Sequence, residues 1–128
     1  MNQMALRLSL AVTTFVFGLA CFLYYETSSL HREVVLHARE TILRENLTQM
    51  REGIKQYISD RDSPPQSLED LVNKGYLSNV PIDPVTGQKD WQLFSDVYEY
   101  SSAREQGILD VRSVSKEISS NNTPYNTW

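Results

Sequence analysis

The sequence predicts an α+β protein in which a long N-terminal helix, one half transmembrane and one half amphipathic, packs on a small C-terminal antiparallel β-sheet. Three observations predict this class: an uncharged apolar run, a helix-type pattern that follows it without a proline, and short alternating segments rich in aromatic residues. The expected domains are an anchor helix (residues 1–25), its amphipathic continuation (residues 26–62) and a small globular head (residues 63–128).

The composition narrows the classes of function. The net charge of −4 argues against a general nucleic-acid binder, which needs clustered basic residues. The single cysteine, Cys21, lies inside the apolar run, so one chain cannot build a disulfide framework or a cysteine-based metal site. We find no nucleophile motif, glycine-rich phosphate loop or His/Cys metal cluster. The sequence therefore does not predict an enzyme, and we assign no catalytic residue, metal ligand or cofactor.

The apolar run over residues 8–25 predicts a single membrane-spanning helix, since about 20 helical residues cross a bilayer. Membrane lipid is therefore its expected partner. Arg7 and the terminal amine precede the run, which predicts a cytoplasmic N-terminus and an exported C-terminal domain. Two alternatives stay open. One is a cleavable signal peptide, although no small-x-small site is found. The other is a lipoprotein signal at Cys21, although the leucine before it is one position out of place.

The amphipathic continuation carries one apolar stripe whose members are four or three residues apart, which is the spacing of a single helix face. The stripe consists of Leu43, Leu47, Met50, Ile54 and Tyr57. We expect this packing face to be buried against the sheet, with Trp91 or Tyr98 close to it. The remaining faces are predicted to be solvated, with Glu40 and Arg44 forming an exposed i,i+4 pair. Their charged residues are Glu40, Arg44, Glu45, Arg51, Glu52 and Lys55.

Helix and turn signals follow the stripe. The long helix is expected to end at residues 60–62, before two prolines. A short helix is expected to begin at Ser67, with Asp70 completing a capping box, and to stop at Lys74-Gly75. The loop over residues 81–87 follows, and in it Asp83 is predicted to be a turn or cap residue.

The last third is predicted to form three short strands, at residues 91–94, 97–100 and 107–112. Ser95-Asp96 is the predicted turn between the first two strands, and a polar loop at residues 101–106 precedes the third. The polar tail that follows is expected to be ordered only if Tyr125 and Trp128 pack onto the rest of the head.

Several segments resemble, in one collinear order, motifs of the G-type pseudopilins of the type II secretion system, which are type IV pilin-like proteins. Residues 44–57 (RENLTQMREGIKQY) resemble the family segment RxNLxxMRxAIxxY. Further matches are residues 67–77 with SLxDLVxxGYL, residues 81–91 with PxDPxTG…DW, and residues 110–128 with DVxSxS…GTPYxxW. The resemblance covers residues 39–128.

The resemblance implies a pilin-like fold and a structural subunit that acts by helix packing and assembly in a type II secretion or type IV pilus-like envelope machine. The implied partners are other pilin-like subunits and inner-membrane assembly proteins. The implied location is the bacterial inner membrane, with a single pass and a periplasmic C-terminal domain. The alternative function is a permanently anchored, unprocessed pilin-fold module that binds a secretion partner or cargo.

The N-terminal region differs from the family pattern. Processed members carry a glycine and then Phe-Thr-Leu-x-Glu at the cleavage point, whereas Ala5 and Ser9 stand at the corresponding start and glutamate positions here. We therefore expect the N-terminus to stay uncut and the protein to remain in the membrane. Asn122 stands where the family has the glycine of its final motif. The calcium site of some members is not predicted, because the oxygen donors Asp96, Glu99 and Asp110 are scattered.

Overall fold

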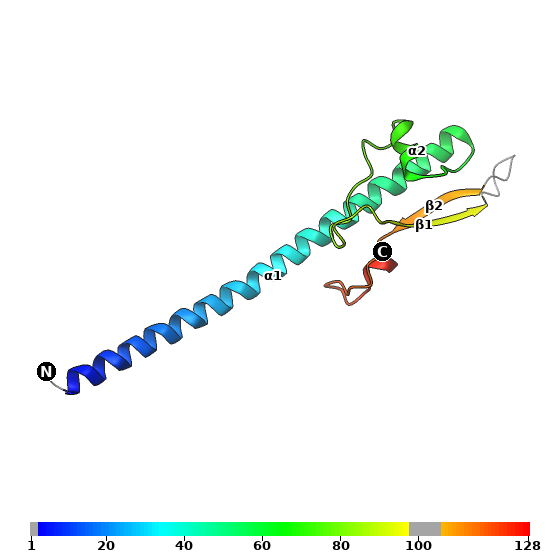
Figure 1. Ribbon diagram of the computed structural model, residues 1–128. Helices are drawn as coiled ribbons and strands as arrows, with labels where there is room; N and C mark the ends of the chain where they lie inside the picture. The colour runs from blue at the N-terminus through cyan, green and yellow to red at the C-terminus, as the bar shows by residue number, and fades with distance from the viewer. Residues whose placement is uncertain (1–2, 98–105) are drawn as a thin grey trace. The chain divides into compact units, whose positions relative to one another are not determined.

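The computed structural model describes residues 3–97 and 106–128 (Figure 1). Its elements are α1 (Gln3–Arg61), α2 (Leu68–Asn73), β1 (Gln92–Val97), β2 (Gln106–Arg112) and the 3-10 helix η1 (Tyr125–Thr127). The chain forms two compact units, Met1–Leu36 and His37–Trp128, and α1 contributes to both. A long N-terminal helix with an apolar part and a small antiparallel sheet make this an α+β protein, as predicted.

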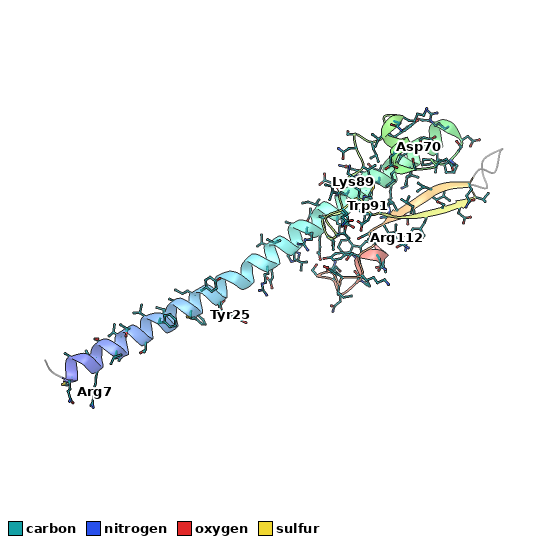
Figure 2. All side chains as sticks on the ribbon, viewed as in Figure 1. Arg7, Tyr25, Asp70, Lys89, Trp91 and Arg112 are labelled. Carbon is teal, nitrogen blue, oxygen red and sulfur yellow. The ribbon has the colours of Figure 1, made fainter. Side chains whose placement is uncertain are left out.

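The first unit is helical, and its stretch Gln3–Glu26 is long and apolar enough to cross a membrane. Figure 2 shows Arg7 and Tyr25 within this stretch. Large apolar side chains are exposed along it, with Phe15 at 72% and Phe17 at 73%. The hydroxyl of Thr14 donates to the carbonyl of Leu10 (3.0 Å), which satisfies that hydroxyl within the helix. An apolar surface of this length is typical of contact with lipid or with other apolar helices.

The core of the second unit gathers around the stripe on α1. Leu43, Leu47, Met50 and Ile54 are each at most 2% exposed, and Tyr57 packs partly buried against them. The other buried members of the cluster are Leu68 and Leu71 of α2, Val80, Trp91, Ile108 and Val111 of β2, and Tyr125. The stripe therefore lies where its spacing predicts, with Trp91 in the same cluster. Tyr98 lies outside the described residues.

Local signals set the ends of both helices in the second unit. Helix α1 ends at Arg61, within the predicted limits and before the buried Pro64 and Pro65. Helix α2 begins after Ser67, whose hydroxyl accepts from the backbone N–H of Asp70 (3.1 Å), while Asp70 accepts from the backbone N–H of Ser67 (3.2 Å). This is the predicted capping box. Gly75 follows with φ of +82°, a left-handed conformation that suits glycine at a helix end.

The predicted turn at Ser95-Asp96 is wrong, because β1 runs through both residues. It pairs antiparallel with β2, with Ser95 opposite Ile108 and Asp96 opposite Gly107. Ser-Asp has turn-forming character, but a sheet partner more than ten residues away along the chain satisfies the backbone here. The register shifts between Phe94 and Ser95, because Leu109 is an extra residue on β2.

The other strand predictions have separate outcomes. The first predicted strand, at residues 91–94, falls largely within β1, which begins one residue later. The third, at residues 107–112, is confirmed by β2, which also includes Gln106 of the predicted loop. The predicted strand at residues 97–100 and the loop that follows lie outside the described residues, apart from their terminal residues Val97 and Gln106.

Gly107 allows β2 to run against the two prolines. A Cβ atom at Gly107 would lie 2.8 Å from Cγ of Pro64 and 2.8 Å from the carbonyl oxygen of Pro65. That oxygen already accepts a hydrogen bond from the backbone N–H of Ile108 (2.8 Å), so it cannot move away without losing the bond.

Gly107→Ala is therefore expected to lower the free energy of unfolding by about 1–3 kcal/mol, the usual cost of overpacking. Urea denaturation of the full chain in detergent measures it, with near-ultraviolet circular dichroism reporting on the second unit. Gly18→Ala is the control, because nothing lies within 4 Å of an added Cβ there. Equal midpoints for Gly107→Ala and the unchanged protein would contradict the close approach.

Candidate functional site

Two features of the described chain are candidates for function. One is the exposed apolar surface of Gln3–Glu26. The other is the contact by which α1 holds the C-terminal segment, defined here as residues 113–128, within the second unit. Glu40 and Arg51, two charged residues of α1, make this contact through four hydrogen bonds. Arg51 makes two more hydrogen bonds to β2, which precedes the segment.

Glu40 is 1% exposed, and its carboxylate is fully engaged. It accepts hydrogen bonds from the backbone N–H of Ser120 (2.6 Å), the Ser120 hydroxyl (2.6 Å) and the Tyr125 hydroxyl (3.1 Å). The prediction of a solvated Glu40 is therefore wrong. Its predicted partner Arg44 is exposed, and its guanidinium lies 4.0 Å from the buried Glu40 carboxylate. The stripe contained the missed signal, since one further step of three residues before Leu43 leads to Glu40 on the same face.

The surroundings of Glu40 favour its ionised form. Burial raises its pKa, but the hydrogen bonds from Ser120 and Tyr125, together with the charge of Arg44, outweigh burial and leave the pKa below its ordinary value. Burial and the neighbouring Glu40 carboxylate raise the pKa of Tyr125. At neutral pH the pair is therefore a carboxylate that accepts from a phenol, in which each group stabilises the protonation state of the other.

Arg51 is the second charged residue of α1 in the contact, and the prediction that it is solvated is also wrong. Its guanidinium donates to Oδ1 of Asp110 (2.8 Å), to the carbonyl oxygen of Val111 (2.9 Å) and to the oxygen of Trp128 (2.7 Å). Arg112 donates to the other carboxylate oxygen of Asp110 (3.2 Å). Burial raises the pKa of Asp110, but these bonds and charges bring it below its ordinary value. Arg51 thus joins the helix to β2 and to the end of the described chain.

The two aromatic residues of the C-terminal segment pack onto the rest of the head, which is the condition set above for an ordered tail. Tyr125 is buried and meets Trp128 edge to face, with ring centroids 5.1 Å apart. The guanidinium of Arg44 lies 4.5 Å from the centroid of Trp128. The Trp128 indole N–H donates to the Thr123 hydroxyl (2.9 Å). The polar tail is therefore part of the folded unit.

Asp83 is a buried turn residue that also reaches the C-terminal segment. Its carboxylate accepts from the backbone N–H of Val85 (2.7 Å) and from the Ser113 hydroxyl (2.5 Å). Its backbone carbonyl accepts from the N–H of Gly87 (2.8 Å), whose φ of +73° closes the loop. The prediction of a turn or cap role for Asp83 is confirmed, and both hydrogen bonds to its carboxylate belong to the architecture of the head.

Asn122 occupies a left-handed position, with φ of +60°. Its backbone N–H donates to the carbonyl oxygen of Ser119 (3.0 Å), which closes a turn in the C-terminal segment. Asparagine and glycine tolerate this conformation, whereas a β-branched residue does not. Asparagine therefore meets the same backbone requirement as the glycine of the motif that this segment resembles.

Asn122→Gly is expected to change the free energy of unfolding by less than about 0.5 kcal/mol, and Asn122→Val to lower it by about 1–2 kcal/mol. Thermal unfolding of both variants, compared with Asn121→Val at the neighbouring exposed position, checks the difference. A destabilising Asn122→Gly would mean that the side chain, not the backbone, matters there.

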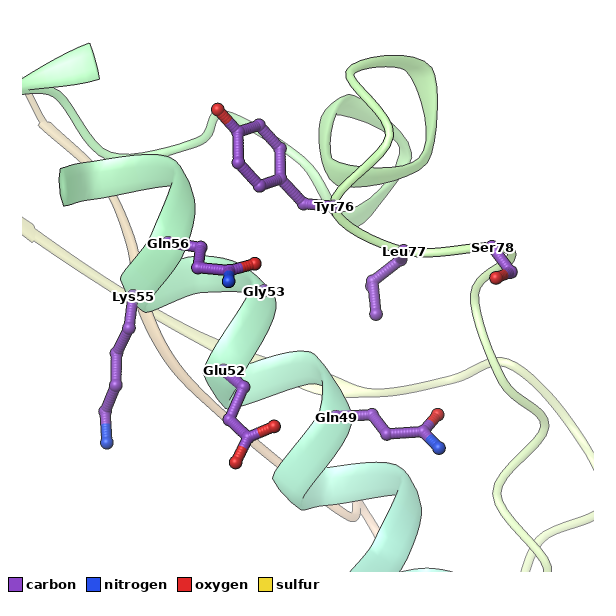
Figure 3. A pocket seen from close by; sticks show the side chains of 8 residues that line it. All are labelled: Gln49, Glu52, Gly53, Lys55, Gln56, Tyr76, Leu77 and Ser78. Atoms are coloured by element: carbon purple, nitrogen blue, oxygen red, sulfur yellow. The ribbon is translucent and has the colours of Figure 1, made fainter. Parts of the chain in front are cut away.

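A shallow groove of about 480 Å³ runs between α1 and the segment after α2 (Figure 3). It is lined by Gln49, Glu52, Gly53, Lys55, Gln56, Tyr76, Leu77 and Ser78. Glu52 and Lys55 are exposed, as predicted for the solvated faces, and Glu45 is exposed as well.

In the described parts of the chain, no three His, Cys, Asp or Glu side chains gather where they could hold a metal ion. Asp96 and Asp110 lie on different strands, and Glu99 is outside these parts.

The described residues thus offer surfaces for packing: an apolar helix surface and a head whose C-terminal segment is fastened to the same helix. Comparisons with protein-family models, with curated proteins and with solved structures give no match for this chain.

Proposed function

We propose that the protein is a pseudopilin-like structural subunit of a type II secretion or type IV pilus-like envelope machine. One observation carries the proposal: the exposed apolar stretch Gln3–Glu26 belongs to the same helix whose stripe from Leu43 to Ile54 forms the core of the head. A helix built in this way can pack with copies of itself through one part and display a folded head through the other.

The residues that carry the resemblance support the proposal through their structural roles. Ser67 and Asp70 form a capping box, Asp83 organises its loop, and Gly75 and Gly87 adopt positive φ angles. These positions tolerate few other residues, because each depends on a specific side-chain acceptor or on the freedom of glycine. The pilin-like fold remains part of the proposal, together with the partners implied by resemblance: other pilin-like subunits and inner-membrane assembly proteins.

The proposed location is the bacterial inner membrane, crossed once, with the head in the periplasm. Arg7 precedes most of the apolar stretch, which favours a cytoplasmic N-terminus. A reporter enzyme that works only in the periplasm is expected to be active when it is fused after Trp128. Activity of a cytoplasmic reporter at the same position would contradict this orientation.

The second candidate is a permanently anchored binding module that contacts a secretion partner or cargo, and Arg7 favours it. No acidic residue precedes Glu26 in the sequence, so nothing in the apolar stretch before that residue neutralises the guanidinium. Moving an unpaired charge into an apolar filament core costs several kcal/mol.

One experiment separates the two candidates. The full chain replaces the major pseudopilin in a bacterium with a type II secretion system, and sheared filaments are collected with and without the assembly machinery. Recovery of the chain in filaments only when the machinery is present supports the subunit. Retention in the membrane fraction contradicts it and supports the anchored module. Arg7→Gln is the matched variant, since it removes the charge and is expected to raise recovery if the charge hinders assembly.

A further inference from the structure

Two ridges of exposed charge run along α1 within the second unit. We define the basic ridge as Arg44 and Lys55, and the acidic ridge as Glu45 and Glu52. All four residues are exposed, and Figure 3 shows Glu52 and Lys55 projecting from α1. Because successive helical residues are turned by about 100°, the two ridges lie about 60–100° apart around the helix. The buried stripe lies on a different side of α1, so the head covers neither ridge.

Three of these charges have no partner of opposite sign in their own chain. Within residues 3–97 and 106–128, no ion pair involves Glu45, Glu52 or Lys55. Glu52 and Lys55 are three residues apart, a spacing that allows a pair along the helix, but they do not form one here. Arg51 is not part of the basic ridge, because its guanidinium is bound to Asp110.

The guanidinium of Arg44 is open to a further carboxylate. It lies over the Trp128 ring, and its distance of 4.0 Å from the Glu40 carboxylate is too long for a hydrogen bond. That carboxylate already accepts three hydrogen bonds from other donors. A hollow of about 290 Å³ opens beside the guanidinium. It is lined by Arg44, Leu47, Thr48, Arg51 and Trp128.

We propose that the basic ridge of one copy contacts the acidic ridge of a second copy, with the two α1 helices side by side, in the same direction and at the same height. Arg44 then meets Glu45 of the second copy, and Lys55 meets its Glu52. The members of these pairs differ in height by about 1.5 Å and 4.5 Å, which long side chains span. The contact rests on the proposed function, because anchorage in one membrane supplies the common direction and height.

The charge pattern favours unlike ridges over a symmetric pair. Two copies that met at the same height through the same ridge would bring Arg44 to Arg44, or Glu52 to Glu52, and like charges repel. Each copy therefore uses one ridge for each neighbour, so the contact can extend to further copies. Exposed ion pairs are individually weak, and confinement in one membrane compensates by raising the effective concentration.

The test uses the full chain with Cys21→Ala in vesicles of phosphatidylethanolamine and phosphatidylglycerol, with a mild oxidant. Thr48 is exposed and lies between the two ridges, so this contact brings Thr48 of neighbouring copies together. Packed helices have axes about 8–10 Å apart, which brings facing Cβ atoms close to disulfide distance. Gln49→Cys is the matched control, since Gln49 is exposed at nearly the same height but is turned by about 100°. We expect Thr48→Cys to dimerise at least about tenfold faster than Gln49→Cys.

Exchange of two charges supplies the second arm. Glu52→Lys added to Thr48→Cys places a lysine beside Lys55 of the neighbour and is expected to slow dimerisation about fivefold. Lys55→Glu is expected to do the same. The double variant Glu52→Lys/Lys55→Glu re-forms the pair with exchanged signs and is expected to restore the rate. Near-ultraviolet circular dichroism checks that the head folds in each variant.

Three outcomes would each overturn the proposal: equal dimerisation at residues 48 and 49, no dimer at residue 48, or a double variant as slow as the single ones. Filament recovery is a separate measurement. Recovery in filaments without the dimer rejects this contact alone, whereas a dimer in a chain that stays in the membrane fraction rejects the subunit function alone.

Discussion

Replacing Leu47 by alanine is expected to lower the free energy of unfolding by about 2–5 kcal/mol, a large part of what a small unit possesses. Leu47 is 2% exposed and lies in the middle of the stripe, between Leu43 and Met50. The cavity left by the lost side chain would border the core cluster to which α2 and β2 contribute, so its walls cannot close without moving a helix or a strand. Thermal and urea unfolding of the full chain in detergent measure the loss.

Ile42→Ala is the matched control for this prediction. Ile42 lies on the same helix and loses a side chain of the same size, but it is 49% exposed. Its replacement is expected to cost less than about 1 kcal/mol, since little buried surface is lost. Similar losses for the two variants would mean that the stripe does not form the core.

Replacing Glu40 by alanine is expected to cost about 2–4 kcal/mol at neutral pH. The change leaves the buried Tyr125 hydroxyl without its acceptor, and a buried unpaired donor costs about 1–3 kcal/mol. It also removes the two hydrogen bonds that the backbone N–H and hydroxyl of Ser120 donate to the charged carboxylate. Water that enters the cavity would recover part of this loss. Glu45→Ala is the control, because Glu45 is exposed on the same helix.

Glu40→Gln tests the charge separately from the shape. The pKa of Glu40 is lowered by folding, so the stability that it contributes is complete above its unfolded pKa of about 4.3 and is lost as the pH falls through the lower folded value. The unfolding midpoint of the unchanged protein should therefore fall in this acid range. That of Glu40→Gln should be lower at neutral pH and fall less on acidification. The slope that remains is assigned to Asp110, whose pKa is lowered in the same direction. Identical slopes for the two proteins would rule out a folded-state carboxylate at residue 40.

The parts of the fold that depend on neighbouring residues could be predicted from the sequence. The stripe, the capping box at Ser67 and the end of α1 follow from helix periodicity, a side-chain acceptor and prolines, all within a few residues. The prediction failed where a distant segment decides the outcome. Ser95-Asp96 is turn-forming by composition, but pairing with β2 keeps it extended.

For the same reason, one part of the candidate site could be predicted from the sequence and the other could not. The apolar stretch is visible in composition alone, whereas the roles of Glu40 and Arg51 depend on partners about 60 to 85 residues away along the chain. A charged residue in a helix is usually solvated, and only its position on the apolar face could have indicated otherwise. Extending the stripe by one step would have identified Glu40, but not Ser120 or Tyr125 as its partners.

The distance along the chain between Glu40 and its partners has a consequence for synthesis and export. Ser120 and Tyr125 follow Glu40 by 80 and 85 residues, so the helix face and the segment that seals it leave the ribosome at different times. If the N-terminus stays inside the cell, the amphipathic half of α1 crosses the membrane before the C-terminal residues do. Its apolar face and Glu40 then stay uncovered until those residues have crossed. Closure of so long a loop is slow. A chaperone or a neighbouring apolar helix would therefore first contact the chain in this state, with the face of α1 not yet covered by the C-terminal segment.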